Sequence, residues 1–68
     1  MALFATVEGG EQVGIGEWVC FKSDVEQSGQ IVKIEGTTLV LENLNGFDGD
    51  YLESQTQTRM PAKYCWVE

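Results

Sequence analysis

The sequence predicts an all-β fold: five strands in one small domain, with a short helical turn before the last strand. β-Branched and aromatic residues gather in runs of about five to seven, and Gly, Asn, Asp and Ser separate these runs. Only one proline interrupts the chain, which is typical of strands joined by turns. No stretch of about 11 residues keeps a convincing helical period of apolar side chains.

The first two predicted strands span residues 17–22 and 29–35. In the first, Val19 and Phe21 are two positions apart, so we expect them on one face of the strand, with Trp18 and Cys20 on the other. In the second, the run "IVKI" breaks strict alternation. This break predicts either a β-bulge or a strand that is buried on both faces.

A tight turn at residues 35–37 leads into the third strand, "TLVLEN". The glycine near the apex of this turn predicts a hairpin. Leu39 and Leu41 should share one face of the returning strand, and Val40 should occupy the other.

The last part of the chain predicts two further strands and a corner. Residues 53–60 alternate polar side chains, which is typical of an edge or solvent-facing strand. The segment "MPAK" contains the single proline, which suits one helical turn because proline fixes φ and donates no hydrogen bond. The closing "YCWVE" is the fifth strand, with Tyr64 and Trp66 expected on one face and Cys65 on the other.

Residues 1–15 are interpreted as an N-terminal arm or extra strand, and residues 16–68 as the domain itself. Within the arm, "LFATV" is compatible with an additional strand. The following "EGGEQVGIG" holds four glycines and predicts a mobile connector.

The run "GEWVCFKSDVEQSGQIVKIEGTTLVLE", residues 16–42, resembles SH3-like barrels of the KOW and Tudor kind. In those barrels a Gly-acid-x-Val start, a loop, a Gly-x-Ile strand and a glycine-turn hairpin follow in this order, and "MPAKYCWVE" is similar to their helical turn and closing strand. The resemblance implies a small five-stranded SH3-like barrel. The chain as a whole also looks similar to uncharacterised accessory proteins of tailed bacteriophages, which implies the host cytoplasm as its compartment.

Charge restricts the class of partner. The chain has 11 acidic and four basic residues, a net charge of −7, and residues 1–53 hold ten of the acids but only Lys22 and Lys33 among the bases. Binding to a phosphate backbone depends on Lys and Arg, so nucleic acid is disfavoured. An acidic field favours encounter with the basic surface of another protein.

The sequence also disfavours membrane-spanning and secreted proteins, zinc-binding proteins and enzymes. No run of about 18 apolar residues predicts a membrane span, and the N-terminus lacks a secretion signal, so a cytoplasmic location is expected. Two distant cysteines, Cys20 and Cys65, without any histidine predict no zinc site, although a single disulfide stays open if the first and last strands pair. The absence of histidine also removes the usual general base. We therefore expect no enzyme, no cofactor and no metal.

The loop "ENLNGFDGDYLE" is the most unusual segment. It combines Phe47 and Tyr51 with Asp48 and Asp50, but its spacing departs from that of an EF-hand. Two aromatics among acids could form a platform for Arg or Lys side chains, or they could fold back and plug the end of the barrel. The candidate binding residues, which include two tryptophans that could converge on this loop, are Trp18, Phe47, Asp48, Asp50, Tyr51 and Trp66.

The sequence therefore predicts a non-catalytic module that docks on a basic surface of another protein. One alternative is an acidic nucleic-acid mimic that inhibits a nucleic-acid-handling protein of a host, which would need carboxylates spaced like phosphates along one face. Another is a structural component of a homo-oligomer or a virion, assembled through strand edges.

Overall fold

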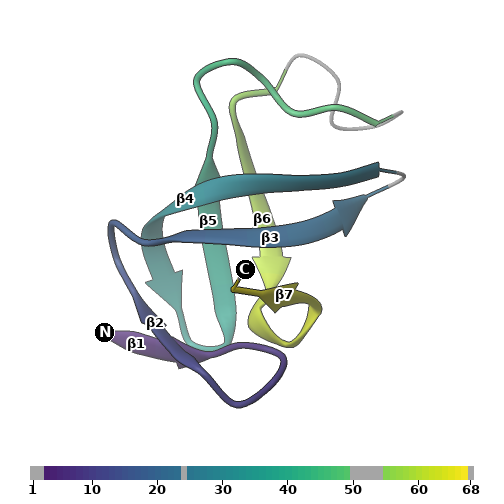
Figure 1. Ribbon diagram of the computed structural model, residues 1–68. Coiled ribbons are helices and arrows are strands. Elements are labelled where there is room, and N and C mark those ends of the chain that lie inside the picture. Colours follow the sequence, from purple (N-terminus) through teal and green to yellow (C-terminus); the bar gives the residue numbers. More distant parts are fainter. Residues whose placement is uncertain (1–2, 24, 50–54, 68) are drawn as a thin grey trace.

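The computed structural model describes residues 3–23, 25–49 and 55–67 of the chain. It is mostly β, with one five-stranded and one two-stranded sheet (Figure 1). The larger sheet has the order β6-β5-β4-β3-β7 and is antiparallel throughout, while β1 pairs with β2. The prediction of an all-β chain is confirmed. The elements in chain order are β1 (Phe4–Thr6), β2 (Gln12–Gly14), β3 (Trp18–Ser23), β4 (Val25–Glu35), β5 (Thr38–Glu42), β6 (Gln57–Pro61), the 3-10 turn η1 (Ala62–Tyr64) and β7 (Cys65–Trp66).

Strand β3 has one face on the core and one face outside. Val19 and Phe21 are buried, whereas Trp18 and Lys22 are exposed. Alternation of this kind follows from the pleat of a strand, because successive side chains point to opposite faces. The predicted assignment of faces is confirmed.

Strand β4 begins at Val25, earlier than the predicted start at residue 29. Its first residues continue the ladder with the end of β3, so that Val25 pairs with Ser23 and Glu26 pairs with Lys22. The sequence analysis left these residues between its first two predicted strands, where the resemblance to SH3-like barrels implies a loop. They belong to the strand because each has a ladder partner on β3.

The predicted bulge in β4 is confirmed at Val32. Ile31 pairs with Leu41 and Lys33 pairs with Val40, which leaves Val32 as the extra residue. Ile31 and Ile34 are an odd number of positions apart, yet both are buried. The extra residue explains this, since it shifts the alternation of the strand by one position.

Strand β5 is buried on both faces along its centre. Leu39 and Leu41 face the core as predicted, and Val40 on the other face is also buried. Val40 lies between Lys33 of β4 and Arg59 of β6 in the ladder. The aliphatic stems of such long side chains can cover an apolar neighbour while their charged ends stay in water.

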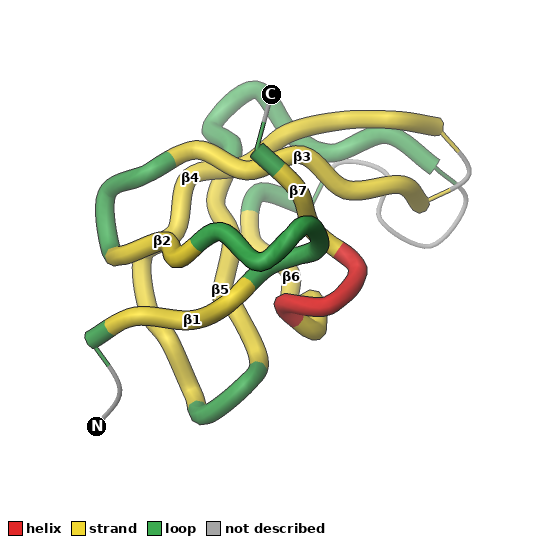
Figure 2. The backbone as a smooth tube through the Cα atoms, turned by 60° about the horizontal axis from the view of Figure 1, so that its bottom comes forward, coloured by secondary structure: helices red, strands yellow, loops and turns green. Residues whose placement is uncertain are grey.

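The C-terminal elements are shorter than predicted. β6 begins at Gln57 and lies at an edge of the larger sheet, and β7 contains only two residues. Positions 53 and 54 of the predicted strand lie outside the described residues. The predicted helical turn is confirmed as η1, which separates these two strands (Figure 2). Tyr64 belongs to this turn and not to the final strand, so its predicted position is wrong.

The N-terminal segment forms a hairpin. The prediction of a connector over residues 8–16 is wrong, because β2 lies within it and Val13 is buried. Gly9 and Gly10 both have positive φ, which lets the chain reverse tightly between β1 and β2. At this reversal the Glu8 amide donates to the Cys65 carbonyl at 2.8 Å, which ties the hairpin to β7.

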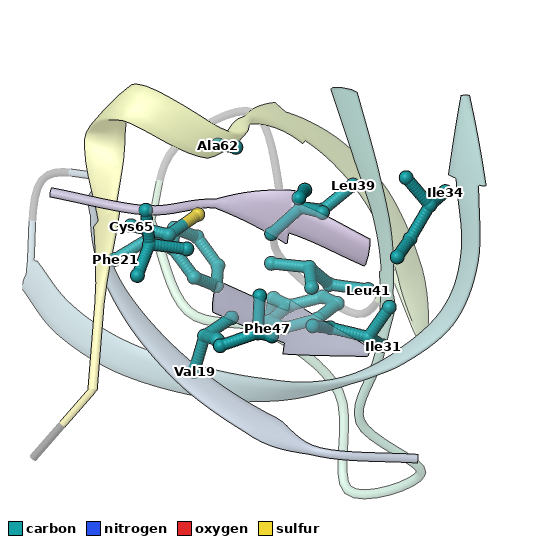
Figure 3. Close-up of a cluster of buried hydrophobic side chains, with 12 residues drawn as sticks. Val19, Phe21, Ile31, Ile34, Leu39, Leu41, Phe47, Ala62 and Cys65 are labelled. Carbon is teal, nitrogen blue, oxygen red and sulfur yellow. The ribbon is translucent and has the colours of Figure 1, made fainter. Parts of the chain in front are cut away.

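The core is one cluster that draws on both sheets and on the loop after β5. Figure 3 shows its labelled side chains pointing toward one another between the strands. No helix in the described part of the chain has the length and apolarity needed to cross a bilayer. The cluster consists of Ala5, Val7, Val13, Val19, Phe21, Ile31, Ile34, Leu39, Leu41, Phe47, Ala62 and Cys65.

Candidate functional site

Phe47 fills the end of the core. Its side chain is only 2% exposed. Its ring meets that of Phe21 edge to face, with 5.5 Å between centroids. Of the two roles considered for Phe47, the structure supports the plug, and Phe47 is not available as a surface anchor. Asp50 and Tyr51 lie outside the described residues.

Local turn chemistry and one glycine explain the position of Phe47. The Asn43 side chain accepts from the Asn45 amide at 3.0 Å, and the Asn43 carbonyl accepts from Gly46 at 2.9 Å, so the chain turns back after β5. Gly29 faces the ring. A Cβ at Gly29 would lie 3.2 Å from two Phe47 ring atoms, so this glycine leaves the room that the aromatic ring occupies.

Asp48 is held at the surface by its backbone. Its amide donates to the Gln27 side-chain oxygen at 2.9 Å, and its carbonyl accepts from the Gln27 side-chain nitrogen, also at 2.9 Å. These two bonds join the loop after β5 to the first part of β4. They leave the Asp48 carboxylate exposed.

Two predicted site residues, Trp18 and Trp66, lie on the same groove. In the ladder, Cys20 is opposite Trp66 of β7 on one side and Ser28 of β4 on the other. Residues directly opposite one another share a face, so these side chains and Trp18 belong to the outer face of the sheet. Between them is a hollow of about 620 Å³. Its lining consists of Trp18, Val19, Cys20, Glu26, Gln27, Ser28, Trp66 and Val67.

The groove carries a carboxylate and no cation among its lining residues. Glu26 is exposed and contributes to the lining. Lys22 is its partner in the ladder. Within the described residues, no Lys or Arg nitrogen lies within ion-pair distance of the Glu26 carboxylate. The groove therefore combines two indoles with a carboxylate that makes no ion pair within the described residues, although Lys22 lies directly opposite it on the same outer face.

Two of the four basic residues are engaged at the far end of β4. The Glu35 carboxylate lies 2.8 Å from the Arg59 guanidinium and 3.4 Å from the Lys33 ammonium. The hydrogen bond from Arg59, followed by the one from Lys33, lowers the pKa of Glu35. These groups are largely exposed, so the cluster affects the local charge more than it affects stability.

A third basic residue, Lys63, has an aromatic partner. Its ammonium lies 5.2 Å from the centroid of the Tyr64 ring. This distance is within the range of a cation–π contact. Lys63 and Tyr64 both belong to η1, whereas the groove is lined by β3, β4 and the C-terminal residues.

The two cysteines lie on opposite faces of the sheet. Cys20 is opposite Trp66, whereas Cys65 is opposite Phe21, so Cys65 points into the core. No disulfide joins them, although the first and last strands of the predicted domain do pair. Burial raises the pKa of the Cys65 thiol to about 11, and its sulfur donates to the Pro61 carbonyl at 3.6 Å.

The residues that the structure describes contain no cluster of three or more acidic or cysteine side chains able to hold a metal ion. The side chains that line the groove include two indoles, the Glu26 carboxylate and the Ser28 hydroxyl.

Sequence reasoning identified both tryptophans but missed Glu26 and Ser28. The signal for these residues was present in the alternation of "VEQSG" after Ser23, where outward Glu26 and Ser28 alternate with Gln27. It was weak because the outward and inward residues are all polar or small.

Comparisons of the chain with protein-family models, with curated proteins and with solved structures give no match.

Proposed function

We propose that the protein is a non-catalytic binding module that docks a basic segment of another protein in the groove between Trp18 and Trp66. One observation carries this proposal. Two large aromatic side chains, distant in sequence, are brought onto one groove by the pairing of β3 with β7. Trp18 is 53% exposed, and binding would remove this apolar surface from water.

The charge distribution supports a basic partner. The chain carries a net charge of −7, and Lys33 and Arg59 are bound by Glu35 away from the groove. Glu26 stands within the groove lining. A partner rich in Lys or Arg would be attracted over a distance by the net charge and held by Glu26 at contact.

The proposal includes a more specific fold, an SH3-like barrel. The strand order β6-β5-β4-β3-β7 and the 3-10 turn just before the last strand support an SH3-like barrel. The β1–β2 hairpin, which contributes Val13 to the same core, would cover one end of such a barrel.

The described carboxylates give the nucleic-acid mimic no particular support. They are spread over the β1–β2 turn, the turn before β3, both ends of β4, the end of β5 and the loop after it. One of them, Glu35, is bound to two cations. The mimic, the homo-oligomer and the likeness to bacteriophage proteins stay predictions.

Affinity capture from a nuclease-treated bacterial lysate tests the proposal. The bait proteins are the wild type, Trp18→Ser and the control Leu44→Ser, which removes another exposed apolar side chain, 82% exposed, from the loop after β5. We expect a discrete partner that is retained by the wild type and the control, weakened by salt and lost with Trp18→Ser. Equal capture by Trp18→Ser would contradict the proposal.

A further inference from the structure

We propose that the side chain which enters the groove is arginine, stacked against the indoles with Glu26 as its counter-ion. This inference rests on the proposed function and specifies the chemistry of the partner at that same site. It follows from three features of the groove: its rings, its unengaged carboxylate and its hydrogen-bond acceptors.

The rings favour a flat cation. Trp18 and Trp66 both line the groove, and tryptophan presents the strongest cation-binding face of the aromatic side chains. A guanidinium is planar and weakly hydrated, so it stacks on an indole at a small desolvation cost. A lysine ammonium is compact and strongly hydrated, and it loses more of its hydration on entering the same space.

Glu26 is the carboxylate that lines the groove, and unlike Glu17, Glu35 and Glu42 it has no partner within the described residues. Glu35 binds Arg59 and Lys33, Glu42 accepts from Gln57 at 3.2 Å, and Glu17 accepts from the Gly14 amide at 2.6 Å. Among the residues that the structure describes, none donates a hydrogen bond or an ion pair to the Glu26 carboxylate. A carboxylate so placed can accept two parallel bonds from one guanidinium.

The remaining polar groups of the groove suit a donor-rich ligand. Ser28 is next to Glu26 on the outer face and offers a hydroxyl oxygen as an acceptor. Gln27 also belongs to the lining, but both polar atoms of its amide are bonded to the Asp48 backbone. A guanidinium offers five N–H donors and no acceptor. The hollow of about 620 Å³ falls in the size range of small-ligand pockets, about 300–1,000 Å³, so it accommodates one such side chain with its flanking backbone.

The NMR signals of the indole N–H groups report binding in the groove, because the chain contains two tryptophans and both line the groove. The probes are three capped pentapeptides, Gly-Ser-X-Ser-Gly, in which X is arginine, lysine or citrulline. Citrulline keeps the shape of arginine without its charge. Each peptide is titrated to about 10 mM, since one side-chain contact supports affinity in the millimolar range.

We expect the arginine peptide to shift both indole signals in a saturable manner. The lysine peptide should bind at least about fivefold more weakly, and the citrulline peptide should bind at least as weakly as the lysine one. Glu26→Gln should weaken the arginine peptide by about fivefold or more, whereas the control Glu35→Gln, with the same charge change on the same strand, should leave binding unchanged. Dispersed amide spectra verify that each variant is folded.

Three results would overturn the inference. Unmoved indole signals at the highest arginine concentration would remove the groove as the arginine site. If the lysine peptide binds with the same affinity as the arginine peptide, the groove has no preference for a guanidinium. If the citrulline peptide binds with that same affinity, neither the positive charge nor Glu26 contributes to binding. In each case the proposed function is judged separately, by whether Trp18→Ser loses its captured partner.

Discussion

Gly29 and Phe47 show how one absent side chain determines the place of another. The hydrogen of Gly29 faces the Phe47 ring, and any Cβ there would also meet the Leu41 Cβ at 3.0 Å. The ring gains an edge-to-face contact with Phe21 in return. The aromatic that looked available for binding in the sequence is therefore a part of the core.

Truncation of Phe47 should be costly. Phe47→Ala removes a buried ring, and we expect the free energy of unfolding to fall by about 3–5 kcal/mol. The control Leu44→Ala changes an exposed residue of the same loop and should alter stability by less than about 0.5 kcal/mol. Urea denaturation followed by tryptophan fluorescence measures both. Should Phe47→Ala prove too unstable to fold, Phe47→Leu gives a smaller loss, and an unchanged midpoint for that variant would contradict the plug.

Because of the Cys65 thiol, we expect the free energy of unfolding to decrease as the pH rises through the alkaline range. Its pKa is about 11 in the folded protein against an ordinary value of 9.0. The unfolded chain therefore loses this proton at lower pH than the folded protein does. The contribution is complete below pH 9 and is lost as the pH rises toward 11.

The measurement is the melting temperature between pH 8 and pH 11 for the wild type, Cys65→Ala and Cys20→Ser. The wild type and Cys20→Ser should lose stability with rising pH more steeply than Cys65→Ala does. Because tyrosines and lysines also titrate in this range, only the difference between variants reports the thiol. Identical slopes for all three proteins would show that Cys65 is not buried in solution.

At the scale of elements, the β1–β2 hairpin is more than an appendage. Val13 contributes a side chain that is 1% exposed, and Ala5 and Val7 join the same cluster. The Glu8 amide satisfies the Cys65 carbonyl on the outer side of β7. The hairpin therefore covers both part of the core and part of a strand edge that would otherwise be open.

Val13→Ser tests this role. The change removes buried apolar surface and places a hydroxyl in the core, so we expect a loss of about 2–3 kcal/mol in the free energy of unfolding. Gln12→Ser, at the exposed neighbouring position of the same strand, should be nearly neutral. Urea midpoints compare the two. A Val13→Ser protein as stable as the control would mean that the hairpin is dispensable for the fold.

Local pattern was enough to predict β3 and the second half of β4. The alternation around Val19 and Phe21 and the break at "IVKI" predicted a two-faced strand and a bulge, and both are present. The three-residue strand β2 was not predictable in the same way. It has one inward residue, Val13, in a segment with four glycines. A single apolar residue among glycines does not distinguish a strand from a turn.

The candidate site could be predicted only in part. Trp18 and Trp66 were predicted as binding residues that could converge on the loop with Phe47. The structure instead places them on a groove at the outer face of the sheet, and this placement depends on the register of β3 with β7, which no local pattern contains. Phe47 was ambiguous for the same reason, since its burial depends on Gly29, distant in sequence. Glu26 was missed because the start of β4 is polar on both faces.

At the scale of the whole molecule, charge is divided between two regions. The protein is small, with a radius of gyration of 10.9 Å, a little more than the Debye length of about 8 Å at physiological salt. Its net charge of −7 opposes association with a second copy and favours a basic partner. In the Lys33–Glu35–Arg59 cluster two cations share one carboxylate, whereas the groove lining contains one carboxylate, Glu26, and no cation.

This division depends on the single extra residue in β4. Before Val32, the even-numbered positions of the strand face outward, as Glu26 does in the ladder, and after it the odd-numbered positions such as Lys33 do so. A strand with uninterrupted phase that pointed Glu26 to water would direct Lys33 and Glu35 into the core, where unpaired charge is prohibitive. The bulge thus acts as a parity change: one continuous strand presents Glu26 to the proposed binding groove at one end and an ion-paired cluster to water at the other.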